Sequence, residues 1–326
     1  MKPYHDNSNI EIERKTKMKK KLFSLALTCL MTLTCTIVAF AENVGNDPSE
    51  YQETHFQINF SDYNVKVVDN SLHLTSKERV TRNLDKDAAN NLCEFEEVLE
   101  KYPDVKENLI SDYRSSENLL AVSFTEAPLV YVDGHYERVS ARSDSSSSSE
   151  ESRKGNFLMY TTVSRGSQSA NGNYKYTAKT YGSWYNNASG GEDFPDSGDD
   201  FILQASPNTF SRVSDNLTAT YNYDPPTGTE GREFWSESGD STYVRYGIKD
   251  DPLGYRQLRN FTLTTVSEGP KSSGYRNIGS YYVHTWESMT LDVNISASSS
   301  KSVSLTLKPE KTSSSWQLYN YVSFNF

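Results

Sequence analysis

The sequence has few of the residues on which common catalytic and metal centres depend. It contains 3 cysteines and 5 histidines in 326 residues. No pair of histidines or cysteines has the short spacing of a zinc site, and no glycine-rich phosphate loop precedes a helical segment. The G-x-S-x-G pattern of a nucleophile elbow is also missing. These absences exclude the local sequence templates of those enzyme classes. A Ser–His–Asp triad assembled in space stays open.

Long hydrophobic runs are missing as well, with one exception near the N-terminus. Three consecutive lysines, Lys19 to Lys21, precede an apolar run from Leu22 to Phe40, which ends at Ala39-Phe40-Ala41. A basic start, an apolar middle and small residues before the cut are typical of a secretory signal peptide. We therefore expect residues 1–41 to be an N-terminal extension and signal peptide, cleaved after Ala41. The alternative is a retained membrane anchor.

Positive charge is scarce in the expected mature chain. The whole sequence carries a formal charge of −10, and the signal segment holds seven basic and three acidic residues, so the mature chain carries −14. This balance argues against nucleic acid and against anionic lipid as general partners. Two cysteines leave with the signal, and the one that remains, Cys93, cannot form an intramolecular disulfide. We expect its thiol to be buried and inert, since it lies in an amphipathic helical pattern.

Residues 42–142 are predicted to form a small α+β domain. Short alternating strands come first, around Phe56 to Leu74. Apolar residues at helical spacing then predict a helix pair between Leu84 and Ser115, with Pro103 in the first turn of the second helix. Strands follow, and Asp133-Gly134 indicates a tight hairpin turn. Next comes a serine-rich stretch, 143–154, which predicts a flexible linker and a domain boundary.

Residues 155–326 show the alternating apolar and polar pattern of β-strands throughout. The pattern is organised around Gly279 to Ile295, where the odd positions are mostly apolar and the even positions mostly polar. Side chains alternate across a strand, so this stretch predicts one long, half-buried strand with Tyr281 and Leu291 inside. About nine strands with turns between them predict an antiparallel β-sandwich or jelly roll. The expected fold class is mainly β.

Aromatic residues are abundant, with 22 tyrosines and 4 tryptophans. Aromatic platforms on a sandwich face can stack on sugars or peptides. The candidate binding residues are Tyr282, Trp286, Trp184 and Trp235. The plainer alternative is that these aromatics fill the core, because they favour strands.

An acidic cluster lies between Gly190-Gly191 and the strand at Phe201. Its candidate metal ligands are Glu192, Asp193, Asp196, Asp199 and Asp200. Carboxylates in a glycine-containing loop suit calcium, although the spacing matches no EF-hand. Solvated loop charge is the alternative, in which case the protein has no cofactor. A pair of these carboxylates could also serve a glycosidase.

Three portions of the chain together resemble a loose group of uncharacterised secreted proteins from Gram-positive bacteria. They are the helix-pair segment Tyr102 to Leu109, the stretch from Trp184 through the acidic loop to Leu203, and the segment Gly279 to Thr285. The group has no assigned activity. The resemblance implies export and a helix pair followed by a sandwich.

The sequence therefore favours a secreted, non-enzymatic protein that binds an extracellular glycan, peptide or cell surface. Such a protein would keep no stable membrane anchor after signal cleavage. Two alternatives stay open. One is a secreted antimicrobial or toxin-like protein that acts on other cells. The other is an extracellular hydrolase that uses the acidic loop at 192–200.

Overall fold

A computed structural model describes most of the chain beyond residue 51. The described residues are 52–77, 86–116, 118–132, 135–139, 154–186, 199–223, 234–239, 241–249, 256–271, 275–285, 291–296, 304–309 and 315–325. All of them belong to one compact unit, Val44–Phe326. The predicted signal peptide and its cleavage site at Ala41 lie outside the described residues, as does the serine-rich stretch up to residue 153.

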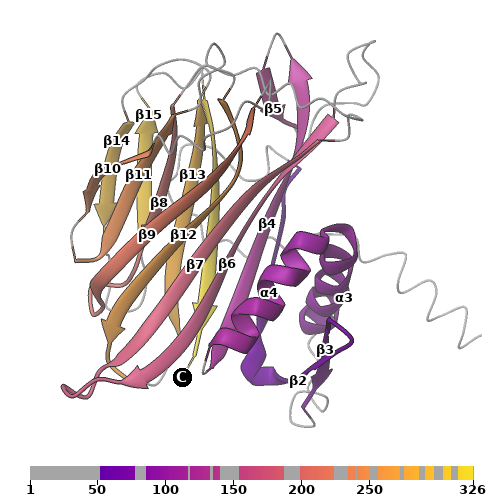
Figure 1. Ribbon diagram of the computed structural model, residues 1–326, viewed down its shortest axis with the longest axis vertical. Helices are drawn as coiled ribbons and strands as arrows, with labels where there is room; N and C mark the ends of the chain where they lie inside the picture. Colours follow the sequence, from indigo (N-terminus) through magenta and orange to yellow (C-terminus); the bar gives the residue numbers. More distant parts are fainter. Residues whose placement is uncertain are drawn as a thin grey trace, which may run out of the picture. The chain divides into compact units, whose positions relative to one another are not determined.

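The larger of two main sheets has seven strands (Figure 1). Its order is β1-β4-β6-β7-β12-β9, and β5 pairs with β4 beside this path. Every neighbouring pair is antiparallel. The strands are β1 (Thr54–Asn59), β4 (Leu119–Val132), β5 (His135–Arg138), β6 (Lys154–Gln168), β7 (Tyr174–Asn186), β9 (Ser211–Tyr223) and β12 (Arg256–Gly269).

The second sheet has five strands in the order β10-β11-β8-β13-β16. These strands are β8 (Asp199–Ala205), β10 (Phe234–Gly239), β11 (Tyr243–Lys249), β13 (Arg276–Thr285) and β16 (Ser315–Phe324). In β16 buried and half-buried residues alternate from end to end. Trp316, Leu318, Val322 and Phe324, which share one face of the strand, are all buried.

The two sheets face each other across a common core. Its central cluster joins Phe157 and Trp184 of the large sheet to Ile202, Tyr282 and Leu318 of the small one. Such a core, closed by alternate residues of both sheets, is that of a β-sandwich. The predicted fold class, mainly β with an antiparallel sandwich and a helix pair, is confirmed.

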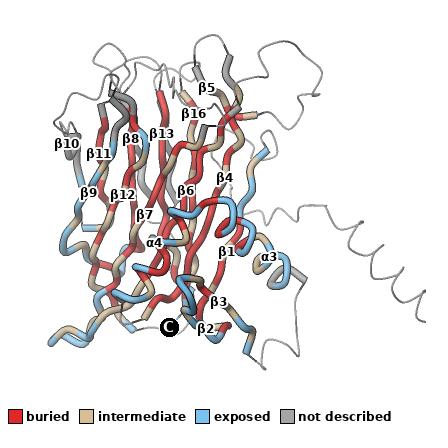
Figure 2. The backbone as a smooth tube through the Cα atoms, turned by 45° about the vertical axis from the view of Figure 1, so that its right-hand side comes forward, coloured by how far each residue is buried: buried red, intermediate tan, exposed pale blue. Residues whose placement is uncertain are grey.

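The helix pair is α3 (Lys86–Lys101) and α4 (Pro103–Ser115), with Pro103 in the first turn as predicted. Its buried residues Phe95, Leu109 and Ile110 pack with Phe124 and Tyr160 of the large sheet, on the face opposite the sandwich core. Figure 2 shows the two helices over one part of this face, with their exposed sides turned outward.

A small hairpin and a single turn complete the structure near the helices. The hairpin consists of β2 (Tyr63–Val68) and β3 (Ser71–Ser76), and its turn residues Asp69 and Asn70 have positive φ. The short 3-10 turn Phe60–Asp62 leads into the hairpin. A separate pair of strands, β14 (Leu291–Ser296) and β15 (Ser304–Pro309), forms its own two-stranded sheet.

The chain does not divide into domains at 143–154 as predicted. Strand β4, which precedes this stretch, pairs with β6, which follows it, from Leu119↔Ser164 to Val130↔Lys154. Strand β1 pairs with β4 in the same sheet. The regions 42–142 and 155–326 therefore share one sheet, and both lie in the unit Val44–Phe326. A serine-rich composition indicates poor burial, and a connection between neighbouring strands meets that condition as well as a domain linker does.

The predicted strand Gly279 to Ile295 is two strands. Strand β13 ends at Thr285, residues 286–290 lie outside the described part, and β14 begins at Leu291 in another sheet. The expected half-burial is also wrong, because β13 is buried on both faces. Tyr282 and His284 face the sandwich core, while Tyr281 and Val283 belong to a second cluster. The side chain of Leu291 is not described.

Cys93 differs from its prediction too. It is a free, exposed cysteine on α3, where a buried thiol was expected. The core-facing side of the helix consists of Phe95, Val98 and Leu99. Position 93 lies on the outer side with Glu96 and Glu97. An amphipathic pattern does not fix the exact edge of its apolar stripe.

Candidate functional site

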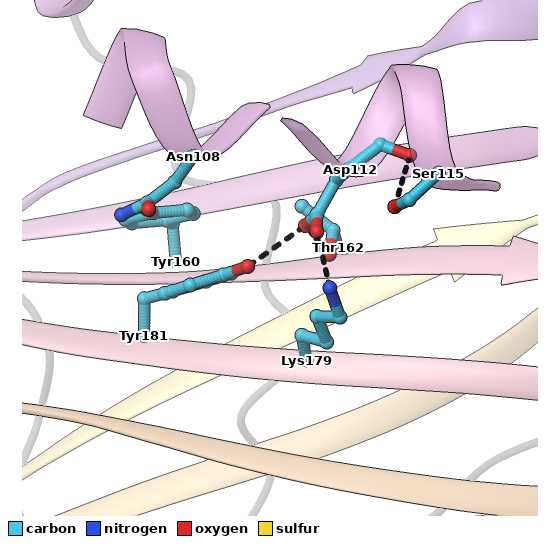
Figure 3. A network of polar contacts seen from close by, with 7 residues as sticks. All are labelled: Asn108, Asp112, Ser115, Tyr160, Thr162, Lys179 and Tyr181. Carbon is cyan, nitrogen blue, oxygen red and sulfur yellow. Dashed lines mark hydrogen bonds and ion pairs between the residues drawn. The ribbon is translucent and has the colours of Figure 1, made fainter. Parts of the chain in front are cut away.

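Three arrangements of polar side chains stand out in the described structure. The first is a ladder between α4 and the large sheet (Figure 3). Asp104, Asn108 and Asp112 are spaced by four residues, so they lie on one side of the helix. The Tyr185 hydroxyl donates to Asp104 (2.7 Å), the Asn108 amide donates to the Tyr160 hydroxyl (3.0 Å), and the Tyr181 hydroxyl donates to Asp112 (3.0 Å).

Asp112 is the centre of this ladder. Its side chain is buried, and its carboxylate also accepts from the Thr162 hydroxyl (2.9 Å) and the Lys179 ammonium (2.5 Å). Burial raises the pKa of Tyr181, and the Asp112 carboxylate beside it adds to the rise. Tyr181 therefore stays protonated and donates. These hydrogen bonds hold the helix pair on the sheet. The polar groups of the ladder are bonded to one another.

The second arrangement is a buried cluster at Asp200, one of the predicted metal ligands. The Asp200 carboxylate accepts from the Tyr282 hydroxyl, from His284 Nδ1 (2.9 Å) and from the Thr285 backbone N–H (3.2 Å). Asp200 and His284 are fully buried. The rings of Trp184 and His284 lie 4.9 Å apart.

This cluster holds an Asp–His pair in the orientation that many hydrolases use for a general base. Its surroundings differ from those of a catalytic base, because Asp200 and His284 have 0% and 1% of their side-chain surface exposed. A buried carboxylate with three donors is a satisfied structural group. Its donors here come from the protein, and its role as a calcium ligand stays a prediction.

The other predicted metal ligands are not placed together. Glu192, Asp193 and Asp196 lie outside the described residues, and Asp199 begins β8 with its side chain undescribed. Within the described ranges, no group of three or more His, Cys, Asp or Glu side chains is arranged to hold a metal ion.

Of the predicted aromatic platform, the two residues whose side chains are described do not lie at the surface. Tyr282 and Trp184 are 0% and 7% exposed, and the Trp184 indole N–H donates to the Tyr282 hydroxyl (3.2 Å). Both rings pack in the sandwich core, as the alternative interpretation expected. Trp235 lies in β10 with its side chain undescribed, and Trp286 lies outside the described residues.

The third arrangement is a surface that we name the open polar face. It lies on the side of the large sheet that carries the helices, because Thr262 and Thr264 of β12 pair with Tyr181 and Lys179 of β7. Both of the latter bond to Asp112 of α4. Beyond them the face is formed by β12 and the edge strand β9. Its residues are Asn260, Thr262, Thr264 and Val266 of β12 and Ser214, Asn216, Thr218 and Thr220 of β9.

These side chains are half-buried or exposed, and they are small, neutral and rich in hydroxyl groups. Cross-strand pairing sets Thr218 opposite Thr262 and Asn216 opposite Thr264. The residues between them, such as Leu217 and Leu263, point into the sandwich core. The T-x-T pattern at Thr218 and at Thr262 was the signal in the sequence that could have found this face.

Comparisons with known proteins leave the family of the chain open. No protein-family model matches the sequence, and the search of curated proteins finds no match. Within the described residues, neither helix is long and apolar enough to cross a membrane.

Three solved structures are distantly similar. A chain titled "Pore forming protein" has 8% identity and a TM-score of 0.27, covering 63% of this chain and 92% of its own. A chain titled "BspA_C_WT" has 8% identity and a TM-score of 0.30, covering 84% and 81%. The Clostridium perfringens NetB toxin in its membrane-inserted form has 11% identity and a TM-score of 0.23, covering 63% and 90%. At these scores the likeness supports no inference about function.

Proposed function

We propose that this protein is an exported, non-enzymatic binding protein whose ligand is a hydroxyl-rich polymer, such as a cell-surface polysaccharide. The observation that supports this is the open polar face. The helix pair packs on β4, β6 and part of β7, whereas β12 and β9 carry solvent-accessible threonine, serine and asparagine side chains on the same face.

The chemistry of this face suits a neutral glycan better than an ionic partner. Hydroxyl and amide groups both donate and accept, so a row of them can exchange hydrogen bonds with water for hydrogen bonds with sugar hydroxyls. Each such bond contributes only about 0.5–1.5 kcal/mol net. A single sugar would therefore bind weakly, and an extended polymer that spans several strands would bind through the sum of its contacts.

The test is sedimentation of the mature protein with insoluble polysaccharides, together with a glycan array. A triple variant replaces Thr218, Thr262 and Thr264 by Val. Valine keeps the branched shape that suits a strand and removes the hydroxyl group. The matched control is Thr75→Val, an exposed strand threonine of the β2–β3 hairpin that lies away from this face.

We expect the triple variant to lose polysaccharide binding while it keeps its unfolding midpoint, and the control to behave like the wild type. Equal binding by the wild type and the triple variant would refute the open polar face as the ligand site.

Two further assays separate the alternatives. Dye release from liposomes or killing of bacteria would favour the toxin-like protein. Turnover of a glycoside that persists in the triple variant would favour the hydrolase. The hydrolase needs an Asp199→Asn test, since a change at Asp200 would disturb the buried cluster with His284.

A further inference from the structure

Arg276 places a positive charge inside the sandwich. It is the first residue of β13, and it shares the core-facing parity of Ile278. Its side chain is only 8% exposed, whereas the preceding residue, Tyr275, is 59% exposed. Arg276 is paired across the sheet with Phe324, which also lies in the core. The guanidinium therefore lies at the end of the strand, between the sheets and close to solvent.

The guanidinium of Arg276 has donors that meet no acceptor. Its Nε and Nη1 atoms are buried and have no hydrogen-bond partner. This contrasts with Arg138, another buried arginine, which forms an ion pair with Glu53. Taking an unpaired charge out of water costs several kcal/mol, and buried donors without acceptors are rare in native proteins. Such a group is one that a ligand can satisfy.

A second arginine lies next to the same place. Arg165 of β6 is paired across the large sheet with Tyr176 of β7, and its guanidinium stacks over the Tyr174 ring at 5.6 Å. Burial raises the pKa of Tyr176 to about 12, while the charges of Arg165 and Arg276 both act to lower it. The geometry agrees, because Arg165 is paired with Tyr176 and Arg276 is paired with Phe324, whose ring contacts that of Tyr176.

Aromatic rings surround the Tyr176 side chain. The Tyr176 ring stacks on Phe210 (4.8 Å) and lies 5.7 Å from Phe324. Among the described residues, Arg276 takes part in none of the ion pairs. Two positive charges in aromatic surroundings are unusual in a chain with a formal charge of −10. Two positive charges close together attract anions.

We propose that Arg276, with Arg165 beside it, binds one oxyanion group, a carboxylate, sulfate or phosphate. The planar guanidinium donates several parallel N–H bonds to such groups, and these bonds are strong where water is excluded. The anion is either a free ion or an acidic substituent on a polymer. The site lies on the core-facing side of the sheets and does not depend on the open polar face.

The first test is calorimetric titration of the mature protein with sodium sulfate, sodium phosphate and sodium acetate against sodium chloride at equal ionic strength. We expect saturable binding of at least one oxyanion, weakened about tenfold or more in Arg276→Gln because the charge-assisted bonds are lost. Arg259→Gln is the matched control, an exposed arginine on β12. It should bind like the wild type.

The second test uses thermal unfolding and does not depend on detecting heat. In chloride alone, Arg276→Gln should melt at the same temperature as the wild type or higher, because it removes an unpaired buried charge. Addition of the binding oxyanion should raise the melting temperature of the wild type more than that of Arg276→Gln. If Arg276→Gln does not fold, Arg165→Gln replaces it, with weakened oxyanion binding expected.

A salt effect that does not saturate and is equal in the wild type and the variants would overturn the proposal. So would saturable binding that Arg276→Gln leaves unchanged. To separate the two sources of the anion, a sulfated polysaccharide is compared with its unsulfated form. Tighter, Arg276-dependent binding of the sulfated polymer assigns the site to a polymer substituent. Equal binding of the two polymers, with inorganic sulfate still bound, assigns it to a free ion.

Discussion

Replacing Asp112 should destabilise the protein far more than replacing Asp104, although both carboxylates accept from a tyrosine on the same sheet. The two residues lie at opposite ends of the ladder on α4. Asp112 is buried and accepts from three side chains. Asp104 accepts from Tyr185 in an exposed hydrogen bond. The two positions share helix, sheet and a tyrosine donor, and they differ in burial and in the number of donors that each carboxylate accepts from.

The magnitude follows from what each substitution leaves behind. Asp112→Ala strands the Tyr181 and Thr162 hydroxyls without their acceptor, and each unsatisfied buried group costs about 1–3 kcal/mol. Lys179 also loses its partner, but its side chain is 31% exposed and stays hydrated, so it adds little. We expect a total of about 3–5 kcal/mol, the range for breaking a buried pair. Asp104→Ala should cost about 0.5–1 kcal/mol, because water replaces the lost acceptor.

The measurement is urea unfolding at neutral pH, followed by circular dichroism, with the free energy taken from the midpoint and slope. Asp112→Asn keeps one acceptor oxygen and should fall between the wild type and Asp112→Ala. The Lys179→Met variant tests the charge by itself and should lose about 1–3 kcal/mol, because the buried Asp112 carboxylate then lacks its cation but keeps the Tyr181 and Thr162 donors. Similar losses in Asp112→Ala and Asp104→Ala would refute the reasoning, because burial would then not decide the cost.

Three further outcomes follow from the packing and the titratable groups. Gly182→Ala should lower the free energy of unfolding by about 3 kcal/mol, since its new Cβ would lie 2.2 Å from the Phe261 ring. Gly166→Ala, whose nearest contact would be at 3.7 Å, should be tolerated, and urea unfolding midpoints compare the two variants. Burial raises the pKa of Tyr246 to about 12, against about 10 in the unfolded chain. Its contribution to stability is therefore present below pH 10 and is lost as the pH rises towards 12. The fall of the urea midpoint above about pH 10 should be shallower in Tyr246→Phe. Cys93 should react with a thiol reagent in the native protein at the rate of a small thiol, and protection until unfolding would contradict its exposure.

Local patterns predicted the local elements well. Pro103 and the apolar spacing around it predicted the helix pair, and both helices appear with the expected core residues. The hairpin predicted from Asp133-Gly134 is present as the pairing of β4 with β5, although the two turn residues lie outside the described residues. These features are fixed by contacts within a few residues, which is why a sequence pattern can carry them.

Long-range pairing could not be predicted from the same patterns. A strand predicted to belong to a separate domain, β4, pairs with β6 across the serine-rich stretch. Alternation in β13 was interpreted as one buried and one exposed face, yet both faces are buried. An alternating sequence shows only that successive side chains lie on opposite faces of the sheet. The polar residues can then face water, or they can face a part of the core that contains hydroxyl and imidazole groups.

The candidate sites were harder to predict for the same reason. Aromatic residues signalled a platform, but Tyr282 and Trp184 fill the core, because large flat side chains bury more area than any others. Asp200 was predicted as a metal ligand from its acidic neighbours, and no local pattern could show that it accepts from His284, a partner 84 positions away. The open polar face escaped notice because threonine is an ordinary strand residue, and only the register sets Thr218 beside Thr262.

The polar groups inside the sandwich bear on why a sheet face, rather than a loop, is proposed to bind. Thr180 bonds to Ser280 (2.6 Å) and to Gln204 (2.6 Å), and Thr265 donates to Gln204. This buried network ties β7 and β12 to the opposite sheet directly behind Thr264 of the open polar face. A fully paired network rigidifies the strands that carry it. A ligand that binds there orders little of the protein, so weak hydroxyl contacts retain more of their free energy than they would on a mobile loop.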